Sequence, residues 1–119
     1  MLWIRVGALL MALGIVFGAF GAHGLKDTLT PESMAVFKTG VLYQMLNALG
    51  LLLVGALDVF QPETRSKRFP CAAFLTAGIV LFSGSLYLIS LCGLTGVGIV
   101  TPIGGFCLAA GWIFLVFTA

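Results

Sequence analysis

The sequence has very few charged residues. Six lysines and arginines and four aspartates and glutamates occur among 119 residues, which is 8% of the chain. A soluble domain carries about 25% charged residues, because its surface must meet water and small domains have proportionally more surface. The formal net charge of +2 is also too small for a protein that holds nucleic acid electrostatically. The scarcity of charge therefore excludes a soluble globule and a basic nucleic-acid-binding module.

Residue types that bind metals or catalyse reactions are also scarce. His23 is the only histidine, and the three cysteines Cys71, Cys92 and Cys107 have no short C-x-x-C spacing. A zinc site needs several such ligands held together, so neither a metal site nor a disulfide is expected. The sequence contains no phosphate-binding loop, no H-E-x-x-H and no G-x-S-x-G motif. We therefore predict a protein that is not an enzyme and has no cofactor.

Long apolar runs occupy most of the chain. Apolar residues make up 61% of the sequence, and its mean hydropathy is +1.18. A membrane-spanning helix needs about 20 mostly apolar residues, and four stretches meet this requirement: residues 3–22, 40–60, 69–92 and 100–119. We predict an all-α fold in which residues 1–119 form one integral membrane bundle of four transmembrane helices with short links. The first stretch is longer than a usual signal-peptide core, so we expect it to be retained.

Two Thr-Pro pairs are typical of helix starts. Thr30 suits the capping position and Pro31 suits the first helical position, where a missing N–H has no consequence. We expect a short interfacial helix that continues through a bend at Gly40 into the second span. Thr101-Pro102 repeats the pair before the fourth span.

The distribution of lysine and arginine predicts the orientation in the membrane. With four spans, both termini and the middle link share one side. That side carries Arg5, Arg65, Lys67 and Arg68, whereas the other side carries Lys26 and Lys38. Because positively charged links stay in the cytoplasm, we predict cytoplasmic termini.

Two helix faces carry residues suited to packing in lipid. The first span has a glycine stripe consisting of Gly7, Gly14, Gly18 and Gly21, and the third has a polar stripe consisting of Thr76, Ser83, Tyr87 and Ser90. Glycines let two helix backbones approach closely, and hydroxyl groups need partners away from lipid. We predict that both stripes face protein, with each other as candidate partners. Leucine at Gly14 or Gly18 is expected to disrupt the bundle.

Polar residues of three spans lie in the same half of the membrane. The candidate ligand-binding residues are His23, Lys38, Gln44, Asn47 and Tyr87. Gln44 and Asn47 are the strongest candidates, since a buried amide is unfavourable unless it is hydrogen-bonded. They either line a small cavity for water, a lipid headgroup or a quinone ring, or they link helices. His23 is expected to bond free carbonyl groups at a helix end. Asp58, near the other end of the second span, is expected to pair with Arg5 or with the 65–68 cluster.

Several blocks of the sequence occur in a familiar order. These blocks are GAFGAHGL, LTPES, LGLLLVG, LFSGSLYLISL and TPIGG. Together they resemble the YgdD-like family of small inner-membrane proteins of unknown function, over nearly the whole chain. The resemblance implies a four-span integral membrane protein. It implies no activity, cofactor or catalytic residue.

Two functional hypotheses follow. The leading one is a non-enzymatic accessory or scaffold protein of the bacterial inner membrane, which forms oligomers or joins a larger membrane complex. The alternative is binding or translocation of a small amphiphile, such as a lipid or quinone, or of an ion through the one-sided polar cluster. A polar, open cavity at Gln44 and Asn47 would favour the alternative.

Overall fold

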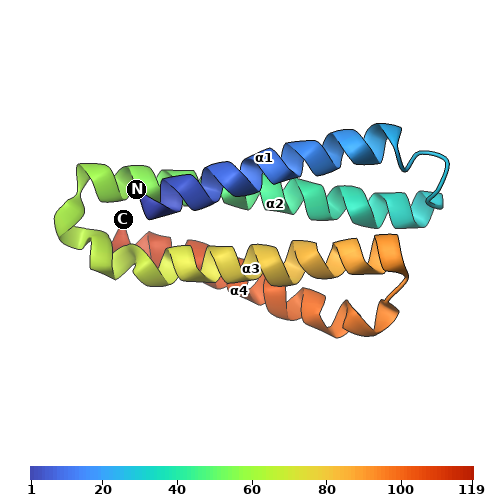
Figure 1. Ribbon diagram of the computed structural model, residues 1–119. Coiled ribbons are helices and arrows are strands. Elements are labelled where there is room, and N and C mark those ends of the chain that lie inside the picture. The colour runs from blue at the N-terminus through green and yellow to red at the C-terminus, as the bar shows by residue number, and fades with distance from the viewer.

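The protein is built from four long helices. The computed structural model describes all 119 residues (Figure 1). Its helices are α1 (Leu2–His23), α2 (Pro31–Phe60), α3 (Arg65–Cys92) and α4 (Val100–Thr118), with short 3₁₀ segments η1 (Pro62–Thr64) and η2 (Thr95–Ile99). All four long helices are long and apolar enough to cross a membrane. The predicted all-α membrane fold is therefore confirmed.

Of the two Thr-Pro pairs, only the first one starts a helix as expected. α2 begins at Pro31, where the Thr30 Oγ1 accepts a hydrogen bond from the Ser33 N–H at 3.1 Å. It then continues through Gly40 as one unbroken helix to Phe60. Thr101 does not cap α4, because α4 begins at Val100. The Thr101 hydroxyl instead lies 2.6 Å from the Ser85 hydroxyl and links α4 to α3.

Each long helix packs against the next one along the chain. Both termini lie at the same end of the molecule as the α2–α3 link, and the α1–α2 and α3–α4 links lie at the opposite end (Figure 1). The principal extents are 50 × 27 × 17 Å, so the bundle is flattened. Only three residues of α1 are buried, all of them glycines, and only three of α4. α2 and α3 therefore form the centre, and α1 and α4 present their outer faces to lipid.

Two apolar clusters form the interior. The larger one comes from α2, α3 and α4 and consists of Leu51, Val54, Cys71, Ala72, Leu75, Ile79 and Leu108. The smaller one lies toward the α1–α2 link and consists of Leu25, Phe37 and Val41. On α2, Gln44 and Asn47 lie between the two clusters. These two amides thus occupy a middle layer with apolar packing on both sides.

The glycine stripe of α1 faces α2. A Cβ atom added at Gly7 would lie 2.9 Å from the Ala48 carbonyl oxygen, so the two backbones are in contact. Added Cβ atoms at Gly14 and Gly21 would collide with the side chains of Met45 and Phe37. Gly18 differs, because its Cβ would lie at an ordinary 3.5 Å from Val41 Cγ1. The close approach that motivates a disruptive effect of leucine is therefore present at Gly14 and absent at Gly18.

The polar stripe of α3 does not meet the glycine stripe. The Ser83 hydroxyl donates to the Gly40 carbonyl oxygen of α2 at 2.7 Å. The Thr76 and Ser90 hydroxyls donate to carbonyl oxygens of α3 itself, at 2.9 and 2.8 Å. The nearest atoms around the four glycines of α1 all belong to α2, so the two stripes are not partners of each other. Hydroxyls that bond their own helix need no partner on another one.

Candidate functional site

Gln44 links three helices. Its side chain is 3% exposed, and its Nε2 donates to the Leu10 carbonyl oxygen of α1 at 2.7 Å. Its Oε1 accepts a hydrogen bond from the Tyr87 hydroxyl of α3 at 2.6 Å. The ring of Tyr87 packs against Phe17 and Phe37, with centroid distances of 5.1 and 5.4 Å. The amide thus fixes the relative positions of α1, α2 and α3 at mid-bundle.

Asn47 points toward a different helix. Its side chain is 5% exposed, and its Nδ2 donates to the Tyr43 carbonyl oxygen of α2 at 2.8 Å. Its Oδ1 accepts a hydrogen bond from the Trp112 indole N–H of α4 at 2.8 Å. The same indole covers Gly50, where an added Cβ would lie 2.7 Å from the ring. Asn47 therefore joins α2 to α4, and the two amides bond on different sides of α2.

Each interior polar side chain has a hydrogen-bond partner. Every buried side-chain nitrogen and oxygen has a partner within the chain. The amide nitrogen and the amide oxygen of Gln44 and of Asn47 each have a hydrogen-bond partner on the protein. This arrangement supports the interpretation of the two amides as links between helices.

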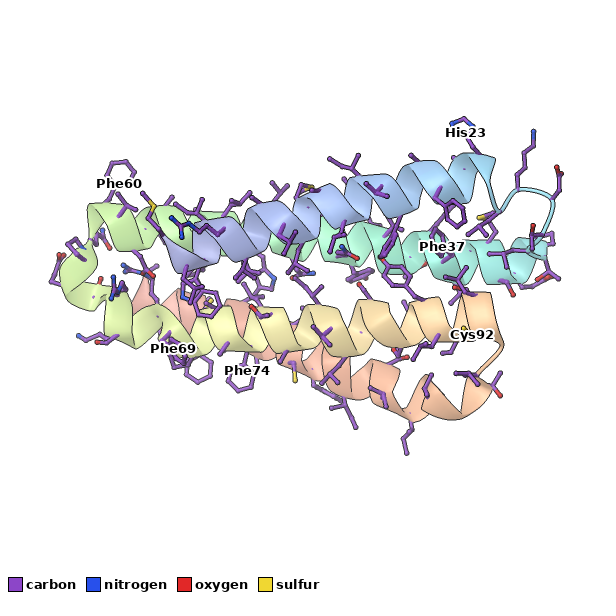
Figure 2. The ribbon with its side chains drawn as sticks, viewed as in Figure 1. His23, Phe37, Phe60, Phe69, Phe74 and Cys92 are labelled. Atoms are coloured by element: carbon purple, nitrogen blue, oxygen red, sulfur yellow. The ribbon has the colours of Figure 1, made fainter.

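His23 and Lys38 lie apart from these amides. His23 is the last residue of α1, and its exposed imidazole points away from the helices (Figure 2). The Phe20 carbonyl oxygen at this helix end accepts from the backbone N–H groups of Gly24 and Leu25, at 2.6 and 3.3 Å. The expected capping by the imidazole is therefore absent. Of the five candidate residues, only Gln44 and Tyr87 bond each other.

A second buried polar site lies at the end that carries the termini. Arg68, which is 0% exposed, pairs with Asp58 through its Nε at 2.8 Å from Asp58 Oδ1. The expectation that Asp58 finds its partner in the 65–68 cluster is confirmed, and Arg5 is exposed. The sequence analysis did not single out Arg68 within the cluster. The available signal was its position ten residues after Asp58 across a short link, next to the C-terminal end of α2, where a cation is favoured.

The Tyr87 hydroxyl gives a direct measure of the mid-bundle link. Tyr87→Phe removes one hydrogen bond and leaves Gln44 Oε1 buried without a donor. We expect the free energy of unfolding to fall by about 1 kcal/mol, as for other hydrogen bonds between membrane helices. Equilibrium unfolding in mixed detergent micelles measures this change.

The matched control is Tyr43→Phe. Tyr43 is 41% exposed, and its ring packs on Phe82 at a centroid distance of 4.8 Å, which phenylalanine preserves. We expect no measurable change in the free energy of unfolding. Equal losses in the two variants would show that the Tyr87–Gln44 bond does not stabilise the bundle.

Comparisons with known proteins place the chain in a family of membrane proteins of unknown function. The model of a family described as "Protein of unknown function (DUF423)" matches residues 17–105. A "UPF0382 membrane protein" of Staphylococcus haemolyticus is 40% identical over 116 residues, which is 97% of this chain and 92% of that protein. The "UPF0382 membrane protein YwdK" of Bacillus subtilis is 39% identical over 117 residues, 98% of this chain and 94% of that protein.

A further relative is also named as a membrane protein. The "UPF0382 inner membrane protein YgdD" of Escherichia coli is 38% identical over 101 residues, which is 85% of this chain and 76% of that protein. No solved structure matches the chain. With four apolar helices and relatives named as membrane proteins along nearly its whole length, this chain is an integral membrane protein that belongs to the DUF423 family of unknown function.

Proposed function

We propose that this protein is a non-enzymatic scaffold or accessory module of the bacterial inner membrane, which assembles with further copies of itself or with a larger membrane complex. The observation that carries the proposal is a second small-residue face on α1. Ala8, Ala12 and Ala19 are exposed, at the i, i+4 and i+11 positions of one stripe. Small residues on a lipid-facing helix allow close contact with another helix.

The interior chemistry supports the same proposal. Gln44, Asn47 and Tyr87 hold the four helices to one another through hydrogen bonds. A bundle fixed in this way offers its outer faces, rather than its interior, to other molecules. The alanine face of α1 lies on the side of the helix away from Gly14 and the other glycines that contact α2, so a partner helix can reach it without disturbing the bundle.

The orientation is part of the proposal. We place the termini and the α2–α3 link in the cytoplasm, because Arg5, Arg65 and Lys67 are exposed at that end. A membrane-impermeant maleimide applied to intact spheroplasts should leave a Ser66→Cys variant unlabelled in a background without native cysteines. Labelling of that residue before the membrane is opened would reverse the orientation.

Disulfide crosslinking in native membranes tests the assembly. In a chain whose three cysteines are replaced by alanine, we expect Ala12→Cys to form a crosslinked species on mild oxidation. The product's mass separates a homodimer from a complex with another subunit. Leu13→Cys is the matched control, since it is also exposed on α1 but about 100° away around the helix. Monomer alone from both variants, and monomer alone by native mass spectrometry, would contradict the proposal.

A further inference from the structure

A groove runs between the end of α1 and the first turns of α2, at the end of the molecule opposite to the termini. Its outer part has a volume of about 480 Å³ and reaches Lys26 in the α1–α2 link. Its inner part has a volume of about 210 Å³ and reaches Met45 on α2. Both parts are lined by Gly21, Ala22 and Lys38, so they form one continuous groove from the membrane surface into the hydrocarbon region.

The outer part is positively charged. Lys26 and Lys38 both line it, and both are exposed. Neither lysine forms an ion pair, since the chain has a single ion pair, at Asp58 and Arg68. The acidic residues at this end, Asp27 and Glu32, do not line the groove. The groove therefore has two lysines and no acidic residue in its lining.

The inner part is apolar. Besides Lys38, its lining consists of apolar side chains and glycines, with Val41 and Met45 on α2 and Gly18 on α1. Lys38 lines this apolar region as well as the outer part. A lysine in such a place lays its aliphatic stem along apolar surface and extends its ammonium group toward the membrane surface. The groove thus has a cationic end at the surface and an apolar end within the membrane.

Gly18 keeps the inner part open. Close packing explains why residue 21 is a glycine, because a Cβ there would collide with the ring of Phe37. Close packing does not explain why residue 18 is a glycine, because a Cβ there would meet only Val41 Cγ1 at 3.5 Å. A larger side chain at this position would instead project along the groove lining. The glycine at this position leaves free space where a ligand chain would lie.

We propose that the groove binds one anionic phospholipid, with its phosphate between the ammonium groups of Lys26 and Lys38 and one acyl chain along Gly18, Val41 and Met45. A zwitterionic lipid would bring its own cation next to the two lysines, so its binding would be less favourable. A soluble phosphate would leave the apolar inner part unfilled. This binding site goes beyond the proposed scaffold function and does not depend on it.

Native mass spectrometry of the full chain tests the site. The protein is released in mild detergent and titrated with phosphatidylglycerol or with phosphatidylcholine of the same acyl chains. Each lysine near a lipid phosphate contributes about a fivefold gain in affinity, so Lys26→Gln/Lys38→Gln should lower the affinity for phosphatidylglycerol by about 30-fold. The affinity for phosphatidylcholine should change little. The matched control Arg65→Gln/Lys67→Gln removes the same charge at the opposite end and should leave both affinities unchanged.

A second variant tests the inner part of the groove. Ala22 is exposed and lines both parts, so Ala22→Leu fills the groove without entering the contact between α1 and α2. We expect it to weaken binding of both lipids, with an unchanged unfolding midpoint in lipid-free micelles. Equal binding of phosphatidylglycerol by the wild type and the double lysine variant would overturn the proposal. Displacement of the bound lipid by millimolar inorganic phosphate alone would assign the site to a soluble anion instead.

Discussion

Replacing Arg68 with methionine is expected to lower the free energy of unfolding by about 3–5 kcal/mol, the range found when one partner of a buried ion pair is removed. Arg68 is 0% exposed and its partner Asp58 is 6% exposed. Methionine fills a similar volume but leaves the Asp58 carboxylate buried without its counter-charge. The carboxylate then has to reach water or become protonated, and either change disturbs the end of α2.

The guanidinium also closes the end of α2. Its Nη2 donates to the Leu57 and Gln61 carbonyl oxygens, at 3.0 and 2.8 Å. Its Nη1 donates to Thr64 Oγ1 at 2.6 Å and to Gln61 Oε1 at 3.3 Å. Carbonyl groups at a helix end have no partner within the helix, and this end carries partial negative charge, so a cation is favoured there. Arg68 thus connects α3 to the last turn of α2 and to the link between them.

Lysine is not expected to replace arginine at this position. The five contacts lie in several directions around a planar group, which a single ammonium group cannot reproduce. Arg68→Lys should therefore retain part of the charge compensation and still lose stability. Equilibrium unfolding in mixed detergent micelles compares the variants.

Two controls isolate the buried pair. Arg65→Met removes a charge from an exposed position three residues away and should change the free energy of unfolding by less than about 0.5 kcal/mol. Asp58→Asn/Arg68→Met removes both charges and should be more stable than Arg68→Met alone, because the unpaired carboxylate is gone. If the double variant loses as much stability as Asp58→Asn alone and Arg68→Met alone added together, the two ions act independently.

The sequence was sufficient for the fold and for the two buried amides that need hydrogen-bond partners, but it did not identify those partners. Apolar length predicts four helices because the membrane core sets their span. Gln44 and Asn47 are predicted to need hydrogen-bond partners because burying an unbonded amide is unfavourable. The helix that each amide reaches depends on how the helices are arranged, which a single sequence does not encode locally. Gln44 bonds α1 and α3, whereas Asn47 reaches Trp112 on α4.

The glycines between α3 and α4 are a second feature that the sequence alone did not identify. Gly104 and Gly111 repeat the seven-residue spacing of Gly7 and Gly14, and all four are buried. The sequence analysis did not select the α4 pair, because α4 is apolar on all sides and Gly105 is equally eligible by composition. Only the packed structure distinguishes Gly104 from Gly105.

Alanine at Gly104 is expected to separate α3 from α4. An added Cβ at this position would collide with the Phe82 backbone nitrogen and would lie 2.8 Å from the Leu81 carbonyl carbon. Backbone atoms of a helix cannot rotate away as a side chain can. On the facing helix, a Cβ at Gly78 would lie 2.9 Å from the Leu108 backbone nitrogen, so the two backbones are in contact along this surface.

The adjacent Gly105 supplies the matched control. Its added Cβ would meet only the Phe82 ring, at 3.7 and 3.8 Å, which is ordinary contact. Alanine is favoured over glycine within a helix by about 1 kcal/mol, and this gain applies to both substitutions. Gly105→Ala should therefore be neutral or slightly stabilising. Gly104→Ala should lower the free energy of unfolding by about 2 kcal/mol, because overpacking exceeds that gain.

The comparison of these neighbouring variants tests whether backbone contact holds the second helix pair together. Both add one methyl group to the same helix, so helix propensity and hydrophobicity change equally. Only the distance to the α3 backbone differs. Unfolding in mixed micelles should separate the two variants by about 2–3 kcal/mol. If both unfold like the wild type, α4 can move away from α3 at little cost, and the Ser85–Thr101 and Asn47–Trp112 hydrogen bonds must then hold α4 in place.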